Sequence, residues 1–132
     1  MTDSLTIALA QLNPTVGDLP GNLEKLRQAR RDAGEVDLVI TPELSIAGYF
    51  PEDLIDRPGF TRDCMIAVQK LAAETAQGGP AIIVGSPWFD DGVIYNAALL
   101  LDGGEVKAKR YKHFLPNYGV FDDQRNFRPG PL

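Results

Sequence analysis

The stretch Val36-Asp37-Leu38-Val39-Ile40-Thr41-Pro42-Glu43 decides the fold, because a short apolar run ends there in a proline and a carboxylate. The run has the length and residue types of a buried strand. Pro42 cannot donate a hydrogen bond to a sheet ladder, so the strand is expected to end before it. Residues 36–40 are therefore predicted to form a strand that delivers Glu43 to its carboxyl end.

The flanking segments alternate between strand and helix patterns. Residues 5–10 are nearly all apolar, as expected of a strand in a sheet that is covered on both faces. Apolar residues at helical spacing then predict a helix that starts after an N-cap at Asn22 and stops at Gly34. Downstream, residues 59–77 carry the inner stripe of the longest predicted helix, and a third strand is expected over residues 81–85.

The second half of the chain predicts a turn and a hairpin. Residues 88–91 are expected to turn, and strands over 93–101 and 106–112 are expected to pair across Asp102–Glu105. Residues 113–132 are rich in proline, glycine and charge and show no periodicity. The order β-α-β-α-β-β-β predicts an α/β layered domain, and because the chain stops in a loop, further residues are expected beyond it.

Composition argues against several classes of protein. The net charge of the 132 residues is −5, whereas nucleic-acid binders usually present a basic field. No apolar run approaches the ~20 residues that span a bilayer, and the first residues lack the basic segment of a signal peptide. The single cysteine, Cys64, cannot form an internal disulfide, which favours a reducing compartment. A cytoplasmic protein with neither nucleic-acid nor membrane partners is predicted.

Glu43 and Lys112 are the two candidate site residues. Glu43 follows a predicted strand and Lys112 closes another, and α/β proteins place ligands at the carboxyl ends of strands. A carboxylate is costly there unless it is paired or used, and an ammonium can stabilise an oxyanion. From spacing alone, Glu43 can equally be a surface-loop glutamate and Lys112 an edge lysine.

The remaining reactive side chains have simpler interpretations. Cys64 lies on the inward stripe of a predicted helix, where a thiol behaves as a small hydrophobe. His113 is the only histidine, so no metal site is predicted, and a structural role or a place in a pocket wall is expected. No glycine-rich phosphate-binding motif is present, so no cofactor is expected to bind within this chain.

Three motifs in order resemble nitrilase-superfamily amidases: Ala10–Asp18, Pro42–Tyr49 and Tyr111–Asp122. The string Leu115-Pro116-Asn117-Tyr118-Gly119-Val120-Phe121-Asp122 specifically resembles the glutaminase domain of glutamine-dependent NAD synthetases, and Pro51–Leu54 agrees with that subgroup. The resemblance implies a four-layer α-β-β-α sandwich, here incomplete. Residues 1–132 would form the N-terminal part of the glutaminase domain.

The resemblance also implies a catalytic set of glutamate, lysine and cysteine that converge on one cavity. Glu43 would be the general base and Lys112 would hold the oxyanion, while Tyr49, Tyr118 and Phe121 would line the glutamine pocket. The nucleophilic cysteine is expected beyond this chain, which alone would be inactive. The subgroup commonly has Glu where this sequence has Asp123, and the shorter side chain is expected to reach a supporting position less well.

For the full-length enzyme, the resemblance implies that L-glutamine is hydrolysed and that ammonia passes to a synthetase domain in the same chain. That domain would use ATP and Mg²⁺ to amidate nicotinic acid adenine dinucleotide to NAD, and a homo-oligomer is expected. Two alternatives stay open. One is a stand-alone nitrilase-type amidase that acts on another ω-amide or a carbamoyl compound. The other is a non-catalytic module that keeps the fold without the nucleophile.

Overall fold

A computed structural model describes residues 3–132 and contains five strands and two α-helices in the predicted order. No helix in this range has both the length and the apolar character that crossing a membrane requires. Short 3₁₀ turns add Glu52–Asp56, Thr75–Gln77 and Asp123–Arg125. The elements are β1 (Ile7–Leu9), α1 (Leu19–Asp32), β2 (Leu38–Ile40), α2 (Phe60–Glu74), β3 (Ala81–Asp90), β4 (Val93–Asp102) and β5 (Glu105–Tyr111).

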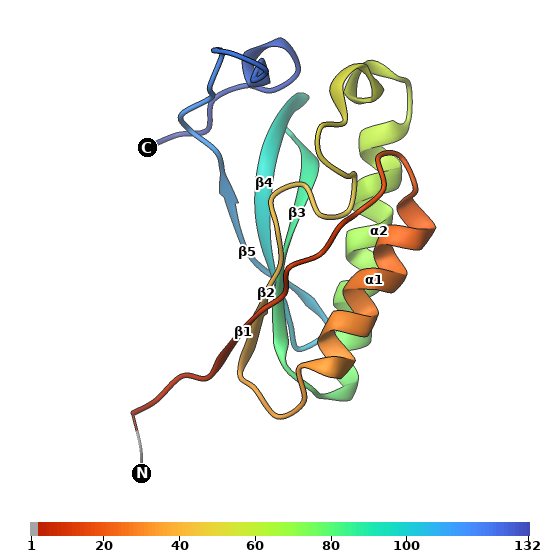
Figure 1. Cartoon of the computed structure of the whole chain (residues 1–132), viewed down its shortest axis with the longest axis vertical. Coiled ribbons are helices and arrows are strands. Elements are labelled where there is room, and N and C mark those ends of the chain that lie inside the picture. The colour runs from red at the N-terminus through yellow and green to blue at the C-terminus, as the bar shows by residue number, and fades with distance from the viewer. Residues whose placement is uncertain (1–2) are drawn as a thin grey trace.

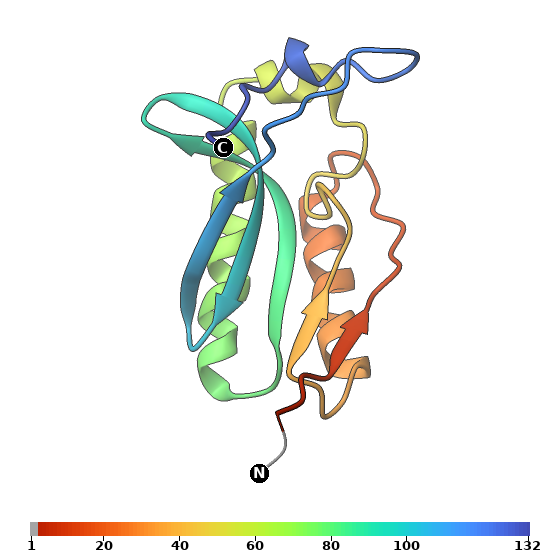
Figure 2. The same ribbon diagram turned by 90° about the vertical axis from the view of Figure 1, so that its left-hand side faces the viewer.

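All strands join one sheet in the order β1-β2-β3-β4-β5. The first three are parallel, and β4 and β5 add antiparallel neighbours, so β1, β2, β3 and β5 run in one direction and β4 runs back (Figures 1 and 2). The carboxyl ends of β2 and β5 therefore lie at the same edge of the sheet. Glu43 and Lys112 follow these two ends.

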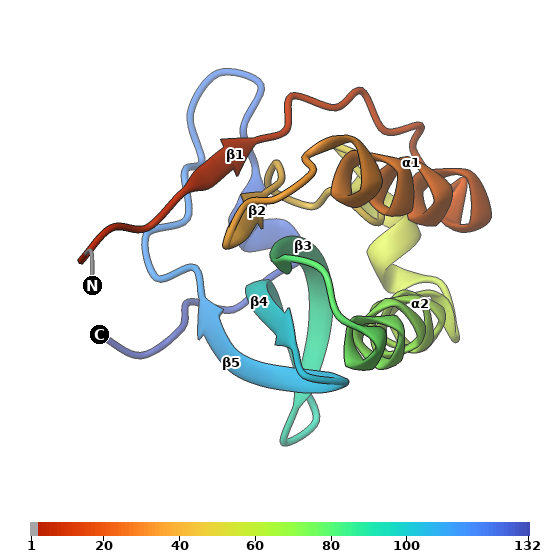
Figure 3. The same ribbon diagram turned by 90° about the horizontal axis from the view of Figure 1, so that it is seen from below.

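Helices α1 and α2 cover one face of the sheet (Figure 3). Because side chains alternate along a strand, every second residue of the central strands points to the helices. Leu99 in β4 is completely buried there, and so is Cys64 on α2. This core contains Leu26, Val39, Cys64, Val68, Leu71, Ile82, Val84, Leu99 and Leu101.

The opposite face of the sheet is uncovered within residues 3–132. We call it the open face and define it by the apolar residues Ile7, Leu9, Leu38, Ile40, Ile83 and Leu100. Leu9 is 76% exposed and Ile7 43%, and the other four are half-buried. The near-continuous apolar strands predicted a sheet that is covered on both faces. Of the four layers of the expected sandwich, residues 3–132 supply one sheet and one helical layer.

The N-cap of α1 differs from the prediction. Asp18 caps the helix, and its side chain accepts a hydrogen bond from the Gly21 backbone N–H at 3.1 Å. Asn22, the predicted cap, is fully buried one turn inside the helix. Its amide group exchanges two hydrogen bonds of 2.8 Å with the backbone of Thr15 and donates a third to the Ile46 carbonyl. Asn22 therefore ties two loops together instead of capping the helix.

Strand β3 is longer than predicted. The turn expected over residues 88–91 lies at Asp91-Gly92, and the strand continues through Pro87 to Asp90. Pairing with β2 ends at Ile83, so beyond that point β3 pairs with β4 alone. A proline is tolerated where one side of a strand has no ladder to complete. Both arms of the predicted hairpin and the helix over 59–77 are confirmed, the helix ending in a 3₁₀ turn.

Candidate active site

The segment that carries Glu43 folds back against β3. The Thr41 backbone N–H donates to the Ile83 carbonyl at 3.1 Å, which extends the β2–β3 pairing by one step. The Ile46 N–H then donates to the Gly85 carbonyl, and the Gly85 N–H donates to the Ser45 hydroxyl, both at 3.1 Å. These bonds fix both ends of the turn, so the position of Glu43 is determined by β3.

Gly85 makes this close approach possible. A Cβ at this position would clash with the backbone nitrogen of Leu44 and lie 2.9 Å from the carbonyl oxygen of Pro42. Leu44 itself has a φ of 52°, in the left-handed region that side chains rarely adopt. It is almost completely buried, so packing holds the unusual conformation in place. The turn is thus a tightly fitted part of the structure.

Strand β5 presents Lys112 from the other side. The Lys112 backbone N–H donates to the Asn96 carbonyl of β4 at 2.9 Å, one residue beyond the end of β5. Next to it, the Tyr111 hydroxyl donates to Asp90 at 2.5 Å, and the Tyr111 ring stacks on Tyr95 with centroids 4.3 Å apart. The end of β5 is therefore anchored to both β3 and β4.

The two predicted site residues meet. Lys112 Nζ lies 2.7 Å from Glu43 Oε1, although the residues are 69 positions apart. The same ammonium lies 3.0 Å from Asp123 Oδ2. The Glu43 side chain is 41% exposed, Lys112 29% and Asp123 only 7%. The structure thus shows an acid and an amine together at the sheet edge, and their catalytic roles stay a prediction.

Asp123, where the subgroup commonly has a glutamate, contacts the Lys112 ammonium directly. Whether it reaches this position less well than a glutamate stays a prediction. A backbone hydrogen bond of 3.1 Å from the Asp123 N–H to the Pro116 carbonyl brings its 3₁₀ turn close to the end of β5. This turn therefore places the Asp123 carboxylate within reach of the ammonium.

Partial burial and neighbouring negative charges have opposite effects on the pKa of Lys112. Burial by itself would lower the pKa of Lys112, but hydrogen bonds with Glu43 and Asp123 outweigh burial and raise the pKa above its usual value. The pKa of Tyr49 is also raised, first by burial and then by the negative charges of Glu43 and Asp123. Lys112 is thus a cation at neutral pH, which suits it to stabilise an oxyanion.

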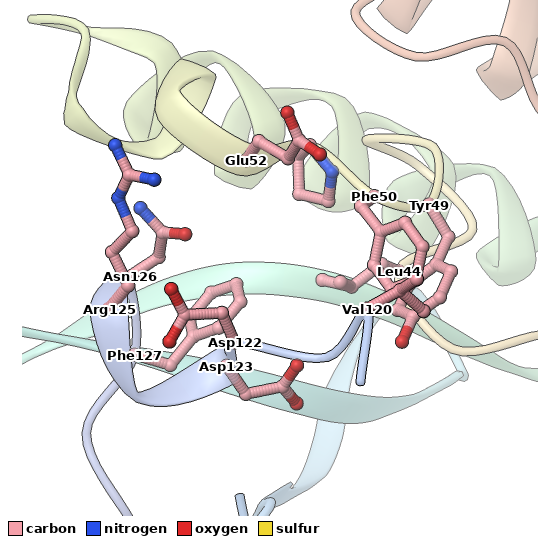
Figure 4. Close-up of a pocket in the computed structure, with 11 residues that line it drawn as sticks. Leu44, Tyr49, Phe50, Glu52, Val120, Asp122, Asp123, Arg125, Asn126 and Phe127 are labelled. Carbon is pink, nitrogen blue, oxygen red and sulfur yellow. The ribbon is translucent and has the colours of Figure 1, made fainter. Parts of the chain in front are cut away.

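One groove contains the pair, and a smaller cavity is lined by Asp123. A groove of about 380 Å³ contains Glu43, Asn96 and Lys112 and extends onto the open face along Ile40 and Ile83. A second cavity of about 140 Å³ lies on the other side of Asp123. In Figure 4, Leu44, Tyr49, Phe50 and Val120 lie at one end of this cavity and Arg125 and Asn126 at the other, with Asp122, Asp123 and the Phe127 ring between them.

The three predicted pocket residues lie along one chain of aromatic contacts. Tyr49 lines the smaller cavity and also shares a further pocket with Glu43. Its ring contacts Phe50 at 3.8 Å, Phe50 contacts Phe121 at 5.8 Å, and Phe121 contacts Tyr118 at 5.7 Å between centroids. Tyr118 is 70% exposed, at the far end of this chain. Tyr49 thus lies beside the acid–amine pair, and binding by all three residues stays a prediction.

Cys64 and His113 lie apart from this chemistry. Cys64 is fully buried in the core, and burial raises the pKa of its thiol to about 12, so the thiolate is scarce at neutral pH. The His113 ring contacts the Gly130 carbonyl at 2.5 Å. Within residues 3–132 no group of three or more His, Cys, Asp or Glu side chains is placed to hold a metal ion.

The sequence matches one known protein family over most of its length. Residues 6–130 match the carbon-nitrogen hydrolase family model. The chain belongs to the carbon-nitrogen hydrolase family. Among curated relatives, the chain is 47% identical to a glutamine-dependent NAD(+) synthetase of Rhodobacter capsulatus over its whole length and 44% identical to that of Thermotoga maritima over 96%. The chain spans only 24% and 22% of the lengths of these two relatives.

Solved structures show the same nitrilase-type α/β fold. A glutamine-dependent NAD(+) synthetase from Cytophaga hutchinsonii superposes with a TM-score of 0.88 at 29% identity, over 96% of this chain and 22% of that one. A mutant of an amidase from Nesterenkonia sp. AN1, with the acetamide moiety of fluoroacetamide added covalently at its active-site cysteine, superposes with a TM-score of 0.83 at 27% identity. It matches 97% of this chain and 49% of the amidase.

Proposed function

We propose that this chain is the N-terminal part of a glutaminase domain, and that the complete protein is a glutamine-dependent NAD synthetase. The contact between Glu43 and Lys112 carries the proposal, because it joins a base and an oxyanion-stabilising cation at the carboxyl edge of the sheet. Sequence identity of 47% and 44% to two such synthetases supports the substrate class.

In the proposed reaction, a cysteine outside this chain is the nucleophile. Glu43 accepts its thiol proton, and the sulfur attacks the carbonyl carbon of the glutamine side-chain amide. Lys112 stabilises the negative oxygen of the tetrahedral intermediate. The carbon–nitrogen bond breaks, the nitrogen takes the proton from Glu43, and ammonia leaves. Water then cleaves the thioester, so that glutamine and water become glutamate and ammonia.

The second half of the proposed activity lies outside this chain. A synthetase domain in the same polypeptide would take up the ammonia, bind ATP and Mg²⁺, and amidate nicotinic acid adenine dinucleotide. The relatives leave room for such a domain, since this chain spans about a quarter of their length. A cytoplasmic homo-oligomer remains part of the proposal.

The proposal is tested with the complete purified protein, supplied with glutamine, ATP, Mg²⁺ and the dinucleotide precursor. We expect NAD to form with glutamine as the nitrogen source, and also with added ammonium. If neither nitrogen source supports NAD formation, the proposal is wrong. Ammonium-driven synthesis without glutamine-driven synthesis would refute the glutaminase assignment alone.

A stand-alone amidase is the second candidate, favoured by the superposition on the Nesterenkonia amidase. It fits less well, because the identity to that amidase is 27% whereas the identity to the Rhodobacter synthetase is 47%. Ammonia release from simple ω-amides by the complete protein, without NAD formation, would favour the amidase. If the complete protein is a non-catalytic module, we expect neither ammonia release nor NAD formation.

A further inference from the structure

Asn96 lies between the two candidate catalytic residues and contacts both. It is in β4 and only 4% exposed. Its side-chain Nδ2 donates to Glu43 Oε1 at 2.7 Å, and its backbone carbonyl accepts the Lys112 N–H at 2.9 Å. One residue therefore contacts the side chain of the acid and fixes the backbone from which the amine projects.

Both hydrogen bonds to the Glu43 carboxylate converge on the same oxygen. Asn96 and Lys112 each donate to Oε1 at 2.7 Å. Among the described residues, none donates a hydrogen bond to Oε2. The amide differs from the ammonium in one chemical respect, because it donates a hydrogen bond without carrying a charge. It can therefore hold the carboxylate in place without adding charge to the site.

We propose that Asn96 is a positioning residue, which holds Oε1 of Glu43 so that Oε2 is the oxygen that accepts the proton. The inference rests on the function proposed above. A general base must lie within hydrogen-bond reach of the proton that it removes, and a carboxylate at the end of a glutamate side chain has rotational freedom to lose. The Asn96 amide, which lines the groove, restricts that freedom.

Asn22 shows how a purely structural asparagine differs. Both residues are buried, at 0% exposure for Asn22 and 4% for Asn96. The hydrogen bonds of the Asn22 side chain go only to backbone atoms of two loops. The Asn96 side chain instead binds an ionisable side chain at the edge of a groove. Asn22 therefore provides a matched control in the same molecule.

The experiment uses the complete protein and compares N96D and N96A with N22D. In N96D the new carboxylate cannot donate a hydrogen bond while ionised, and it places a second negative charge beside Glu43. We expect glutamine-driven kcat to fall roughly 10-fold to 100-fold, since a misplacement of about 1 Å can cost ~10²-fold. KM is expected to change little, and the acidic limb of the kcat/KM pH profile is expected to move to higher pH.

For N22D we expect a lower melting temperature and an unmoved pH profile, because that side chain holds loops and no ionisable group. Ammonium-driven synthesis should be retained in all three variants. An N96D enzyme with the wild-type pH profile and kcat would overturn the inference, as would a change confined to KM.

A crystal structure of the N96A protein supplies a readout that does not need activity. We expect the Glu43 carboxylate to rotate away from its present position at Lys112. If Glu43 keeps both its orientation and its contact with Lys112, Asn96 does not position it. Absence of glutamine-driven activity in the wild-type protein would instead refute the proposed function, and the N96A structure would still decide the role of Asn96.

Discussion

The two faces of the sheet use the same strands for different purposes. Leu99 and Leu100 are neighbours in β4, yet Leu99 is fully buried against the helices and Leu100 is half-buried on the open face. The groove that holds Glu43 and Lys112 extends onto the open face, not onto the helical one. One face therefore stabilises the fold, and the edge of the other carries the candidate site residues Glu43 and Lys112.

This difference follows from the alternation of side chains along strands. Apolar residues at both sets of positions make the strands look alike in sequence, but only one set contacts α1 and α2. Substitutions on the helical face should change stability, and those at the edge of the open face should change activity. The following predictions test this separation.

The largest effect is expected at the site. Glu43→Ala and Lys112→Ala in the complete protein should each lower glutamine-driven kcat/KM, because a general base or an oxyanion donor is lost. The loss should correspond to an activation free energy that is higher by about 3–5 kcal/mol. Ammonium-driven synthesis should be unchanged, as should both activities of the exposed control Lys109→Ala. Equal losses with glutamine and ammonium would assign both residues to folding or assembly.

Next come the neighbouring leucines of β4. Leu99→Ala should lower the free energy of unfolding by about 2–5 kcal/mol, because it leaves a cavity in a closed core. Leu100→Ala should cost clearly less, since half of that side chain already meets solvent. Urea unfolding of the 132-residue chain measures both values. Equal losses would show that the two faces are equally packed.

The pH dependence of stability should report on Cys64. Burial raises the folded pKa of its thiol from 9.0 to about 12, so its contribution to stability is complete below pH 9 and is lost as pH rises toward 12. In that window the wild-type chain should lose about 1.4 kcal/mol per pH unit more than Cys64→Ala. Unfolding curves at pH 8, 10 and 11 measure this difference, and parallel decreases would contradict it.

The smallest change in stability is expected on the open face. Leu9 is 76% exposed, so Leu9→Lys should alter the free energy of unfolding by less than about 0.5 kcal/mol. It should nevertheless reduce self-association of the 132-residue chain, because exposed apolar patches promote association. The control Ile66→Lys makes the same chemical change on α2, away from that face. Equal sedimentation of both variants would argue against association through the open face.

The sequence predicted the element order because it depends on short-range patterns, whereas the meeting of Glu43 with Lys112 was implied by the family resemblance. Apolar runs, helical spacing and hairpin turns are local signals, and the two side chains follow strands that end at one edge. The buried stripe of α2, including Cys64, was predicted because its apolar residues recur at helical spacing.

The predictions failed where distant backbone contacts decide the outcome. A turn was predicted over residues 88–91, but β3 continues to Asp90, and Pro87 is tolerated within it because the pairing of β3 with β2 ends at Ile83, a fact of register that no local pattern contains. Asn22 looked like a cap, whereas its partners lie in two loops. Asn96 was missed, although a lone amide in the apolar run of β4 was a usable signal.

Asp123 has a further consequence for turnover. Its carboxylate and that of Glu43 surround one ammonium, so this corner of the molecule carries a formal charge of −1. A neutral carboxamide can enter without like-charge repulsion, whereas the newly formed γ-carboxylate of glutamate would be repelled. The site would thus favour departure of its own product. We expect Asp123→Asn to make glutamate a stronger inhibitor of the complete protein, and an unchanged inhibition constant would exclude this role.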